Sequence, residues 1–261
     1  MPAGFDDQRR LSARRKRTNH FVSWGSNTTS EMPTRSAWLV EHLRQALLDG
    51  KYPQGSRLNE VHLSRQLHVS RTPVRAALHV LAGEGLLRHT ANKGFAVREF
   101  SLSEIVDAYE LRALAEGLAA RFAAERGVSD GSREVLRRAL AEGDRALKVR
   151  SKRETQRSTY AQVNEVFHST IHEAARSNLL RDVIRVCQRI PQASAHNVIA
   201  FDLKDVRARH QAHHRIYHAI VCREPREAEE LMREHVLSVK ISMIRTLAQK
   251  KRRNKGSRSR E

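Results

Sequence analysis

Apolar residues recur every three or four positions over most of this 261-residue chain, a spacing typical of amphipathic helices. The first three such segments cover residues 34–49, 59–68 and 70–82. In the third, Ser70 suits the N-cap and Pro73 falls in the first turn, where proline is tolerated. The apolar stripe of this segment consists of Val74, Ala77, Leu78 and Leu81. The pattern predicts two short helices that meet at a tight bend, the second packed on its apolar face.

The opposite face of residues 70–82 is polar and basic. Thr72, Arg75 and His79 point away from the apolar stripe, and Arg71 lies at the exposed start of the helix. A helix with a packed back and basic residues in its first turns suits the major groove of DNA. We therefore interpret it as a recognition helix.

Short apolar segments of strand character follow at residues 86–98. Leu86–His89 and Phe95–Arg98 can pair as a hairpin, and the polar turn between them holds Lys93. A short basic hairpin can act as a wing that touches the phosphate backbone or the minor groove. Three helices and this hairpin predict a winged helix-turn-helix over residues 34–100.

From residue 101 onward, helical spacing is nearly the only signal. The first helix begins at a capping box formed by Ser101 and Glu104. It carries one apolar stripe made of Leu111, Leu114, Leu118 and Phe122. Further helices are expected over residues 130–149, 153–176, 178–190, 192–200, 203–223 and 225–248. The predicted fold class is therefore mainly α, with the winged helix-turn-helix followed by an all-α bundle of six or seven helices over residues 101–248.

The net charge of +19 exceeds what solubility requires and predicts a salt-sensitive attraction to a polyanion. We expect residues 1–33 to form a disordered basic arm and residues 249–261 a basic tail. Cys187 and Cys222 lie in apolar helical stretches without CxxC spacing, which indicates reduced, buried thiols. No segment is long enough to span a membrane, and the N-terminus has no apolar signal core. We expect a cytoplasmic, nucleoid-associated protein without a membrane partner.

The residues around the bend follow a specific order. They are Gly55, Leu58, Glu60 and Leu63, then the run Val69–Leu78, then Leu81 and Glu84-Gly85-Leu86. This order resembles the DNA-binding domain of GntR-family transcriptional regulators. The resemblance implies that Arg71, Thr72 and Arg75 reach bases and phosphates and that Gly94 lies in the wing. Ser70 and Lys93 complete the predicted set of DNA-binding residues.

Histidines in the predicted bundle are placed so that several could meet in its interior. Asn164 and His168 are four residues apart beside one apolar stripe, so both side chains can reach one point. His214 shares a helix face with His210, and His235 falls on the core-facing stripe of the last helix. Three imidazoles and one amide oxygen would suit a divalent ion such as Zn²⁺ or Ni²⁺. The alternative is that each histidine is a hydrogen-bonded core residue.

Further residues of the bundle form a second family pattern. They are Asp107–Arg112, Phe167-His168, Ser177-Asn178, His214-Arg215-Ile216 and His235. This pattern resembles the FCD effector domain of FadR-type GntR regulators. The resemblance implies a divalent metal, held by an aspartate and three histidines, that helps to bind a small carboxylate effector. Here the histidines would be His168, His214 and His235, and Asn164 occupies the place of the aspartate. An amide is a neutral and weaker ligand, so this exchange weakens the metal site.

Arg112 is the best candidate for holding the carboxylate of the effector, because a guanidinium can bond a carboxylate at two points. Tyr109 and Glu116 lie beside it on the same helix and complete the predicted effector site. An intrahelical pair between Arg112 and Glu116 is the alternative. Three other histidines are expected at the surface or behind the ligands: His172, His213 and His218.

These features predict a ligand-responsive transcription regulator, which we expect to be a repressor rather than an enzyme. It would bind a palindromic double-stranded DNA operator as a homodimer. Two alternatives stay open. A metal-dependent enzyme acting on a small acid could use the same histidines, although the sequence lacks a nucleophile or general-base motif. A nonspecific architectural DNA binder would use the positive charge without a preference for sequence.

Overall fold

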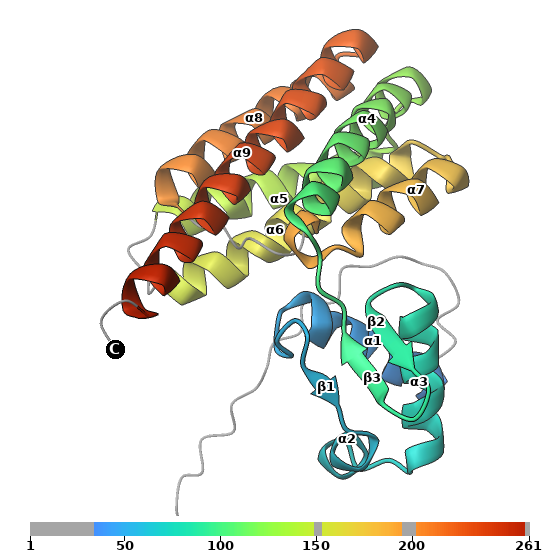
Figure 1. The fold of residues 1–261 in the computed structure, drawn as a ribbon. Helices are drawn as coiled ribbons and strands as arrows, with labels where there is room; N and C mark the ends of the chain where they lie inside the picture. The colour runs from blue at the N-terminus through green and yellow to red at the C-terminus, as the bar shows by residue number, and fades with distance from the viewer. Residues whose placement is uncertain (1–33, 149–152, 195–201, 259–261) are drawn as a thin grey trace, which may run out of the picture. The chain divides into compact units, whose positions relative to one another are not determined.

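The computed structural model (Figure 1) describes three stretches of the chain, residues 34–148, 153–194 and 202–258. The predicted arm, residues 1–33, lies outside the described residues. So do residues 195–200 of the helix predicted over 192–200, and the last three residues of the predicted tail. Within the described stretches, no helix combines the length and the apolar composition that crossing a membrane requires.

The first part of the chain has the elements of a winged helix-turn-helix. In order they are α1 (Arg35–Leu48), β1 (Arg57–Leu58), α2 (Glu60–Gln66), α3 (Arg71–Gly83), β2 (Leu87–Thr90) and β3 (Gly94–Val97). Capping side chains place two of the helix starts. The Thr34 hydroxyl accepts a hydrogen bond from the amide of Ala37, and the side-chain oxygen of Asn59 accepts from the amides of Val61 and His62. The predicted helices and hairpin are confirmed, and β1 adds a strand to the sheet.

The bend between α2 and α3 is tight, and His68 adopts a left-handed backbone conformation in it (φ 53°). The three strands are antiparallel in the order β1-β3-β2, with Leu58 opposite Phe95 and Leu87 opposite Val97. The core of this domain unites α1, α2, α3 and the sheet. Its most buried members include Leu39, Leu43, Leu63, Val74, Leu78, Leu81 and Phe95. This core holds the apolar stripe of α3 inward and leaves its polar face exposed.

The second part of the chain is an all-α bundle. Among the described residues it contains α4 (Leu102–Arg126), α5 (Asp130–Lys148), α6 (Arg153–Ala174), α7 (Asn178–Gln188), α8 (Leu203–Val221) and α9 (Pro225–Arg258). Of the helix predicted over residues 192–200, residues 192–194 are described; the first two end a short 3-10 turn, η1 (Pro191–Ala193), and Ser194 follows it outside any helix. Helix α9 runs beyond residue 248, where the pattern placed its end. It packs along α4 and α8, while α5 packs along α6 and α8 (Figure 1).

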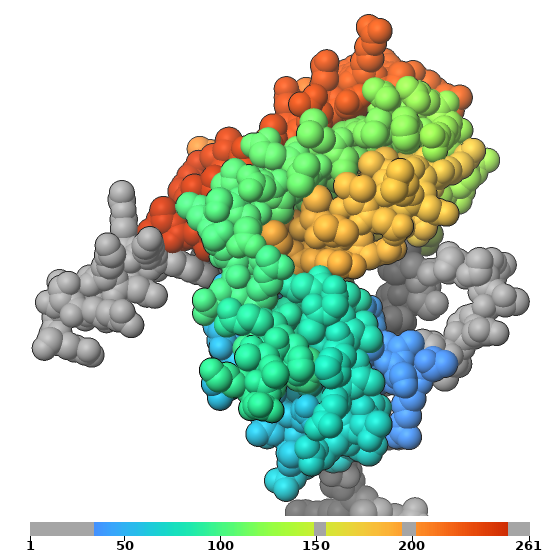
Figure 2. All heavy atoms as spheres, turned by 45° about the vertical axis from the view of Figure 1, so that its right-hand side comes forward, coloured from blue at the N-terminus to red at the C-terminus, as the bar shows by residue number. Residues whose placement is uncertain are grey.

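Only part of the predicted apolar stripe of α4 enters the core, because Leu118 and Phe122 are partly buried against a cluster shared with α7 while the two leucines before them are exposed. Leu111 is 57% exposed and Leu114 is 52% exposed. The buried face of α4 is instead rich in alanine, and its Gly117 lies so close to α9 that an added Cβ would sit 3.0 Å from the backbone oxygen of Glu229. Small residues are needed where two helix backbones approach closely, so Leu111 and Leu114 are displaced to the surface. In Figure 2, α4 and α7 lie side by side on one face of the bundle.

The two cysteines occupy different environments. Both are free; Cys187 of α7 is buried, whereas Cys222 is exposed. The prediction of a buried thiol is therefore wrong for Cys222. The physical reason is its place as the C-cap residue of α8, where the helix leaves its packed neighbours.

Candidate functional site

The first turn of α3 presents the predicted DNA-binding residues to solvent. Ser70 is the N-cap residue and makes no capping hydrogen bond with its side chain within the described part of the chain. Thr72 is exposed, and the side chains of Arg71 and Arg75 are 60% and 56% exposed. Lys93 and Gly94 are exposed in the turn of the wing, where Gly94 takes a positive φ of 75°. The structure thus brings together on one domain a basic helix start and a basic turn.

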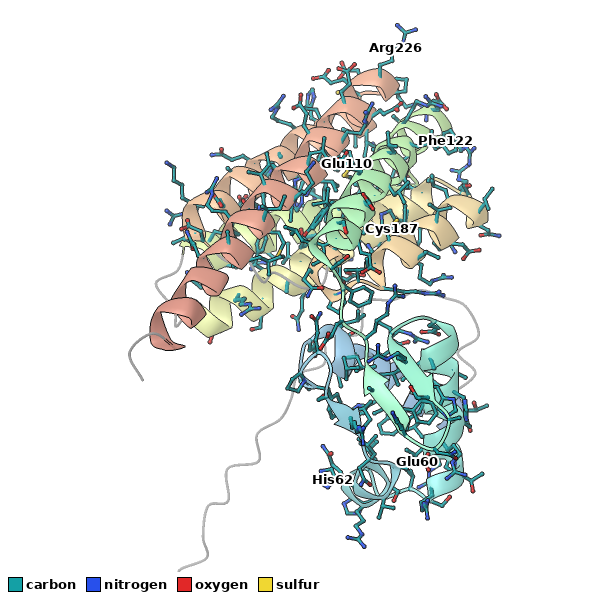
Figure 3. All side chains as sticks on the ribbon, in the orientation of Figure 1. Glu60, His62, Glu110, Phe122, Cys187 and Arg226 are labelled. Atoms are coloured by element: carbon teal, nitrogen blue, oxygen red, sulfur yellow. The ribbon has the colours of Figure 1, made fainter. Side chains whose placement is uncertain are left out.

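Glu60 of α2 positions the arginines of α3. Its carboxylate accepts hydrogen bonds from Nε of Arg75 at 3.0 and 3.1 Å and lies 2.8 Å from Nη2 of the same residue. Arg71 approaches the same carboxylate at 3.8 Å. The hydrogen bonds from Arg75 lower the pKa of Glu60. The family pattern includes Glu60, labelled in Figure 3, but its role as a brace could not be inferred before the helix packing was known.

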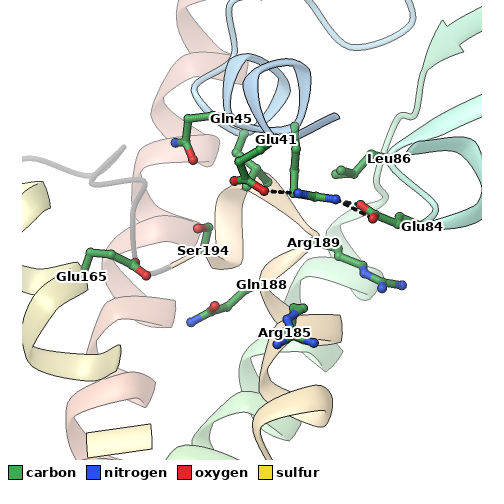
Figure 4. Close-up of a pocket in the computed structure, with 11 residues that line it drawn as sticks. Glu41, Gln45, Glu84, Leu86, Glu165, Arg185, Gln188, Arg189 and Ser194 are labelled. Atoms are coloured by element: carbon green, nitrogen blue, oxygen red, sulfur yellow. Dashed lines mark hydrogen bonds and ion pairs between the residues drawn. The ribbon is translucent and has the colours of Figure 1, made fainter. Parts of the chain in front are cut away.

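Other contacts fix α3 on its neighbours. The ring of His79 lies 4.9 Å from both the ring of His89 on β2 and that of Phe95 on β3, measured between centroids. At the far end of α3, Arg44 of α1 donates hydrogen bonds of 2.9 and 2.6 Å to Glu84 and also pairs with Glu41 (Figure 4). The recognition helix is therefore held against both the wing and α1.

Three histidines meet in the interior of the bundle. One ring nitrogen each from His168 (α6), His213 (α8) and His235 (α9) lies within 4.8 Å of the others, and all three residues are buried. The Nε2 atoms of His213 and His235 are 3.2 Å apart. Bonds of about 2.0–2.1 Å to a tetrahedral ion would place ligand nitrogens roughly 3.3 Å apart, so this spacing fits a divalent metal.

Two further observations fit a metal at this position. The Nε2 atom of His168 is buried and has no hydrogen-bond partner among the described residues. Burial, and next the imidazole of His235, holds the pKa of His213 well below its usual range; burial and then His168 do the same for the pKa of His235. Both rings are consequently neutral near pH 7, which is the form that binds metal ions.

The predicted ligand set differs from this cluster at one position. Asn164 is buried one helical turn before His168, and His168 and His235 meet in the interior. His214 does not join them, because its side chain is 45% exposed and faces Asp144 of α5. Its neighbour His213, expected at the surface or behind the ligands, takes that place. A helix turns by about 100° per residue, so adjacent histidines face different neighbours.

The predicted effector residues bond to one another and to the backbone. Nε of Arg112 donates to Glu116 at 2.6 Å, and its Nη1 donates to the carbonyl oxygen of Ala193 at 2.8 Å. The Tyr109 hydroxyl donates to the carbonyl oxygen of Gln192 at 2.6 Å. The intrahelical pair between Arg112 and Glu116 is therefore present, and Tyr109 and Arg112 hold η1 against α4.

Glu116 links this network to the histidine cluster. One of its carboxylate oxygens lies 2.5 Å from Nδ1 of His168 and 3.1 Å from Nε2 of His172. Burial alone would raise the pKa of Glu116, but Arg112 and the two imidazoles outweigh it and hold that pKa well below its usual range. A carboxylate on the far nitrogen of a histidine orients the ring and makes it a stronger ligand. Glu116 is thus placed to support His168.

A second buried arginine, Arg209 of α8, was not predicted. It is 7% exposed, and its Nη2 lacks a hydrogen-bond partner within the described residues, with Asp205 3.9 Å away. Burial lowers the pKa of Arg209. The hydroxyl of Tyr160 is also buried without a described partner, and Arg209 acts electrostatically on both Tyr160 and His235. Unsatisfied polar groups of this kind commonly mark a place for a ligand or ordered water.

A winged helix-turn-helix joined to a helical domain with a polar, histidine-lined interior defines a DNA-binding transcription regulator that responds to a ligand. Comparison with known proteins agrees. The model of the gntR family of bacterial regulatory proteins matches residues 36–97, and that of the FCD domain matches residues 107–238. The chain therefore belongs to the GntR family of transcription regulators and carries an FCD domain.

Individual relatives span both domains. The Nta operon transcriptional regulator of Aminobacter aminovorans is 34% identical over 183 residues, which cover 70% of this chain and 81% of that protein. The HTH-type transcriptional repressor GlaR of Escherichia coli is 23% identical over 204 residues, covering 75% of this chain and 90% of GlaR. The solved structure of E. coli McbR/YncC has the same fold, with a TM-score of 0.69 at 19% identity over 81% of this chain and 98% of that one.

Proposed function

We propose that this regulator is a homodimeric repressor that acts on the bacterial nucleoid in the cytoplasm. Two copies of α3 would occupy half-sites of a palindromic operator, and a small organic acid bound in the FCD domain would change operator affinity. Effector and operator would then be linked reciprocally, because each binds one state of the dimer better. The exposed arginines of α3 and the unsatisfied polar interior of the FCD domain support the two halves of this proposal.

A divalent metal fits the same interior. His168, His213 and His235 would hold it, with Glu116 behind His168 and with Asn164 one turn away on α6. When bound, such an ion would supply a positive centre for a carboxylate oxygen. The neutral amide of Asn164 leaves the site more positive than an aspartate would, which favours an anionic ligand.

The observation that carries the effector proposal is Nη2 of Arg209, which is buried and has no hydrogen-bond partner in the part of the chain that the structure describes. Arg112 is occupied by Glu116 and Ala193, so Arg209 is the better candidate to bind an incoming carboxylate. Arg209 and His235 also line a cleft of about 260 Å³ between α8 and α9. Drug-sized ligands occupy pockets of about 300–1,000 Å³, so this cleft suits a small acid.

Arg209→Met should abolish the thermal stabilisation of the protein by its acid effector. In the wild type, an acid present at 100 times its Kd should add about 2.7 kcal/mol, or roughly 5–10 °C in Tm, in a screen with and without Zn²⁺. Arg137→Met, which removes an exposed arginine of α5, should retain the shift. An acid that stabilises Arg209→Met as strongly as the wild type would contradict the role of Arg209.

The exposed apolar side chains of α4 and α7 support pairing of two copies of this chain. They are Leu111 and Leu114 on α4, with Leu179, Val183 and Val186 on α7. Five large apolar side chains exposed on two neighbouring helices favour an interface on this side of the bundle. We therefore expect the variant Leu111→Glu/Leu114→Glu to be a monomer by sedimentation equilibrium, because pairing would bury charges without partners. Ile241→Glu, at an exposed apolar position of α9, should remain a dimer; a dimeric double variant would place the interface elsewhere.

Selection of bound fragments from a random DNA pool tests the regulator proposal against its alternatives. A palindrome with half-sites about one helical turn apart is expected. Binding with a steep salt dependence but no enriched sequence would instead favour an architectural DNA binder. Turnover of a small acid that survives in an Arg71→Ala/Arg75→Ala variant would favour a metal-dependent enzyme.

A further inference from the structure

A second group of potential metal ligands lies at the surface between α5 and α8. His210 and His214 are four residues apart on α8 and therefore share one face of it. Asp144 of α5 places a single carboxylate oxygen, Oδ1, 3.2 Å from Nε2 of His210 and 3.2 Å from Nε2 of His214. The three ligand atoms all lie within 4.8 Å of one another.

This spacing matches the coordination shell of an ion. Ligand atoms about 2.0–2.2 Å from a tetrahedral Zn²⁺ lie roughly 3.3 Å apart, close to both observed distances from Oδ1 to a ring nitrogen. Two imidazoles with one carboxylate are also a donor set that borderline divalent ions prefer. We propose that Asp144, His210 and His214 form a second, surface site for a divalent transition ion such as Zn²⁺, Ni²⁺ or Cu²⁺.

The local packing explains how the site is assembled. Gly143 precedes Asp144, and a Cβ at that position would meet the His210 ring at 2.2 Å, so only glycine lets the ring lie directly against α5. His210 is buried, while His214 and Asp144 are 45% and 42% exposed at their side chains, which leaves the site open to solvent. In the absence of an ion, Nε2 of His210 can donate to the carbonyl oxygen of Leu140, 3.1 Å away. An ion would replace this proton.

The surface site is separate from the interior cluster although both use α8. His210 and His214 face α5, whereas His213 faces His168 and His235. The ring centroids of His210 and His213 are only 6.0 Å apart. An ion at the surface site would join α5 to α8 by direct bonds. One of its ligands, His210, would lie next to His213 of the interior cluster.

Zn²⁺ titration of the full-length protein, purified without a histidine tag and stripped with chelator, tests the proposal. The wild type is expected to bind an ion at the surface site. The affinity for this ion should fall by about tenfold or more in His214→Ala and in Asp144→Asn, because each substitution removes or weakens a direct ligand. His62→Ala, which removes an exposed histidine of α2, should bind as the wild type does. His213→Ala should retain this surface ion.

Because the variants act on different clusters, the two metal proposals can fail independently. Loss of binding in His213→Ala with no change in His214→Ala would leave only the interior site and overturn the surface site. The surface site would also be overturned if His214→Ala and Asp144→Asn both bind the same number of Zn²⁺ equivalents as the wild type, with the same affinity. Circular dichroism of each variant checks that its fold is retained.

Discussion

Glu116→Ala should lower the free energy of unfolding of the metal-free protein by about 3–5 kcal/mol, the usual cost of removing one partner of a buried ion pair. Arg112 is 3% exposed, and Glu116 is its only described carboxylate partner within ion-pair distance. The alanine variant would leave a buried guanidinium with one carbonyl acceptor, that of Ala193. His168 and His172 would lose their shared acceptor as well. Urea denaturation at pH 7 measures the change.

Two comparisons separate lost charge pairing from lost packing. Glu116→Gln keeps the shape of the side chain and should still destabilise strongly, whereas Arg112→Met/Glu116→Gln should recover part of the loss because no buried charge is left unpaired. Glu134→Ala removes an exposed carboxylate that pairs with Arg137 on the surface of α5, and little change is expected there. A Glu116→Ala variant as stable as Glu134→Ala would show that the network contributes nothing measurable.

The DNA-binding domain was predictable because its signals are local. The N-cap at Ser70, the proline at Pro73 and the apolar stripe of α3 all lie within a dozen residues, and the family pattern spans the same segment. The contact between α2 and α3 could not be predicted from these local signals. Glu60 faces Arg75 only once α2 and α3 have packed across the bend at His68.

The FCD domain was harder because its helices carry apolar residues on more than one side. On α4 the larger apolar side chains, including Leu111 and Leu114, predict the buried face, but close packing against α9 requires small residues there. On α8 the buried positions Val206, His213, Ile216 and Ile220 follow one helical stripe. That stripe is the signal that could have distinguished His213 from His214 before the structure was known.

The hydrophobic pattern of the sequence also could not show which charged side chains are buried. Arginine is mostly exposed in folded proteins, so a hydrophobic pattern predicts Arg209 at the surface. In the structure Arg209 is buried beside the histidine cluster. The same expectation made Arg112 look available to a ligand. Only the partners of the two guanidinium groups separate their roles. Arg112 bonds to Glu116 and to the carbonyl oxygen of Ala193, whereas Nη2 of Arg209 has no hydrogen-bond partner among the described residues.

Arg75→Ala should reduce the preference of the protein for its operator over random DNA by roughly 5- to 150-fold, the range for losing one good two-point contact to a base. The structure gives the reason for expecting a base contact. Glu60 engages Nε and Nη2 of Arg75, which holds the guanidinium in one orientation at the exposed start of α3. An oriented donor can discriminate between bases, whereas a freely rotating one supplies mainly charge.

Lys93→Ala is the matched control, because it removes an exposed positive charge from the turn of the wing. It should weaken binding to all sequences alike and reduce the slope of log K against log salt by about one, as expected for a lost phosphate contact. Glu60→Gln should fall between the two: discrimination decreases because Arg75 loses its brace, while binding to random DNA increases because a negative charge is gone. Competition titrations of labelled operator against random DNA at several salt concentrations measure both quantities. If Arg75→Ala and Lys93→Ala lose affinity equally for operator and random DNA, Arg75 contacts phosphate and specificity arises elsewhere on α3.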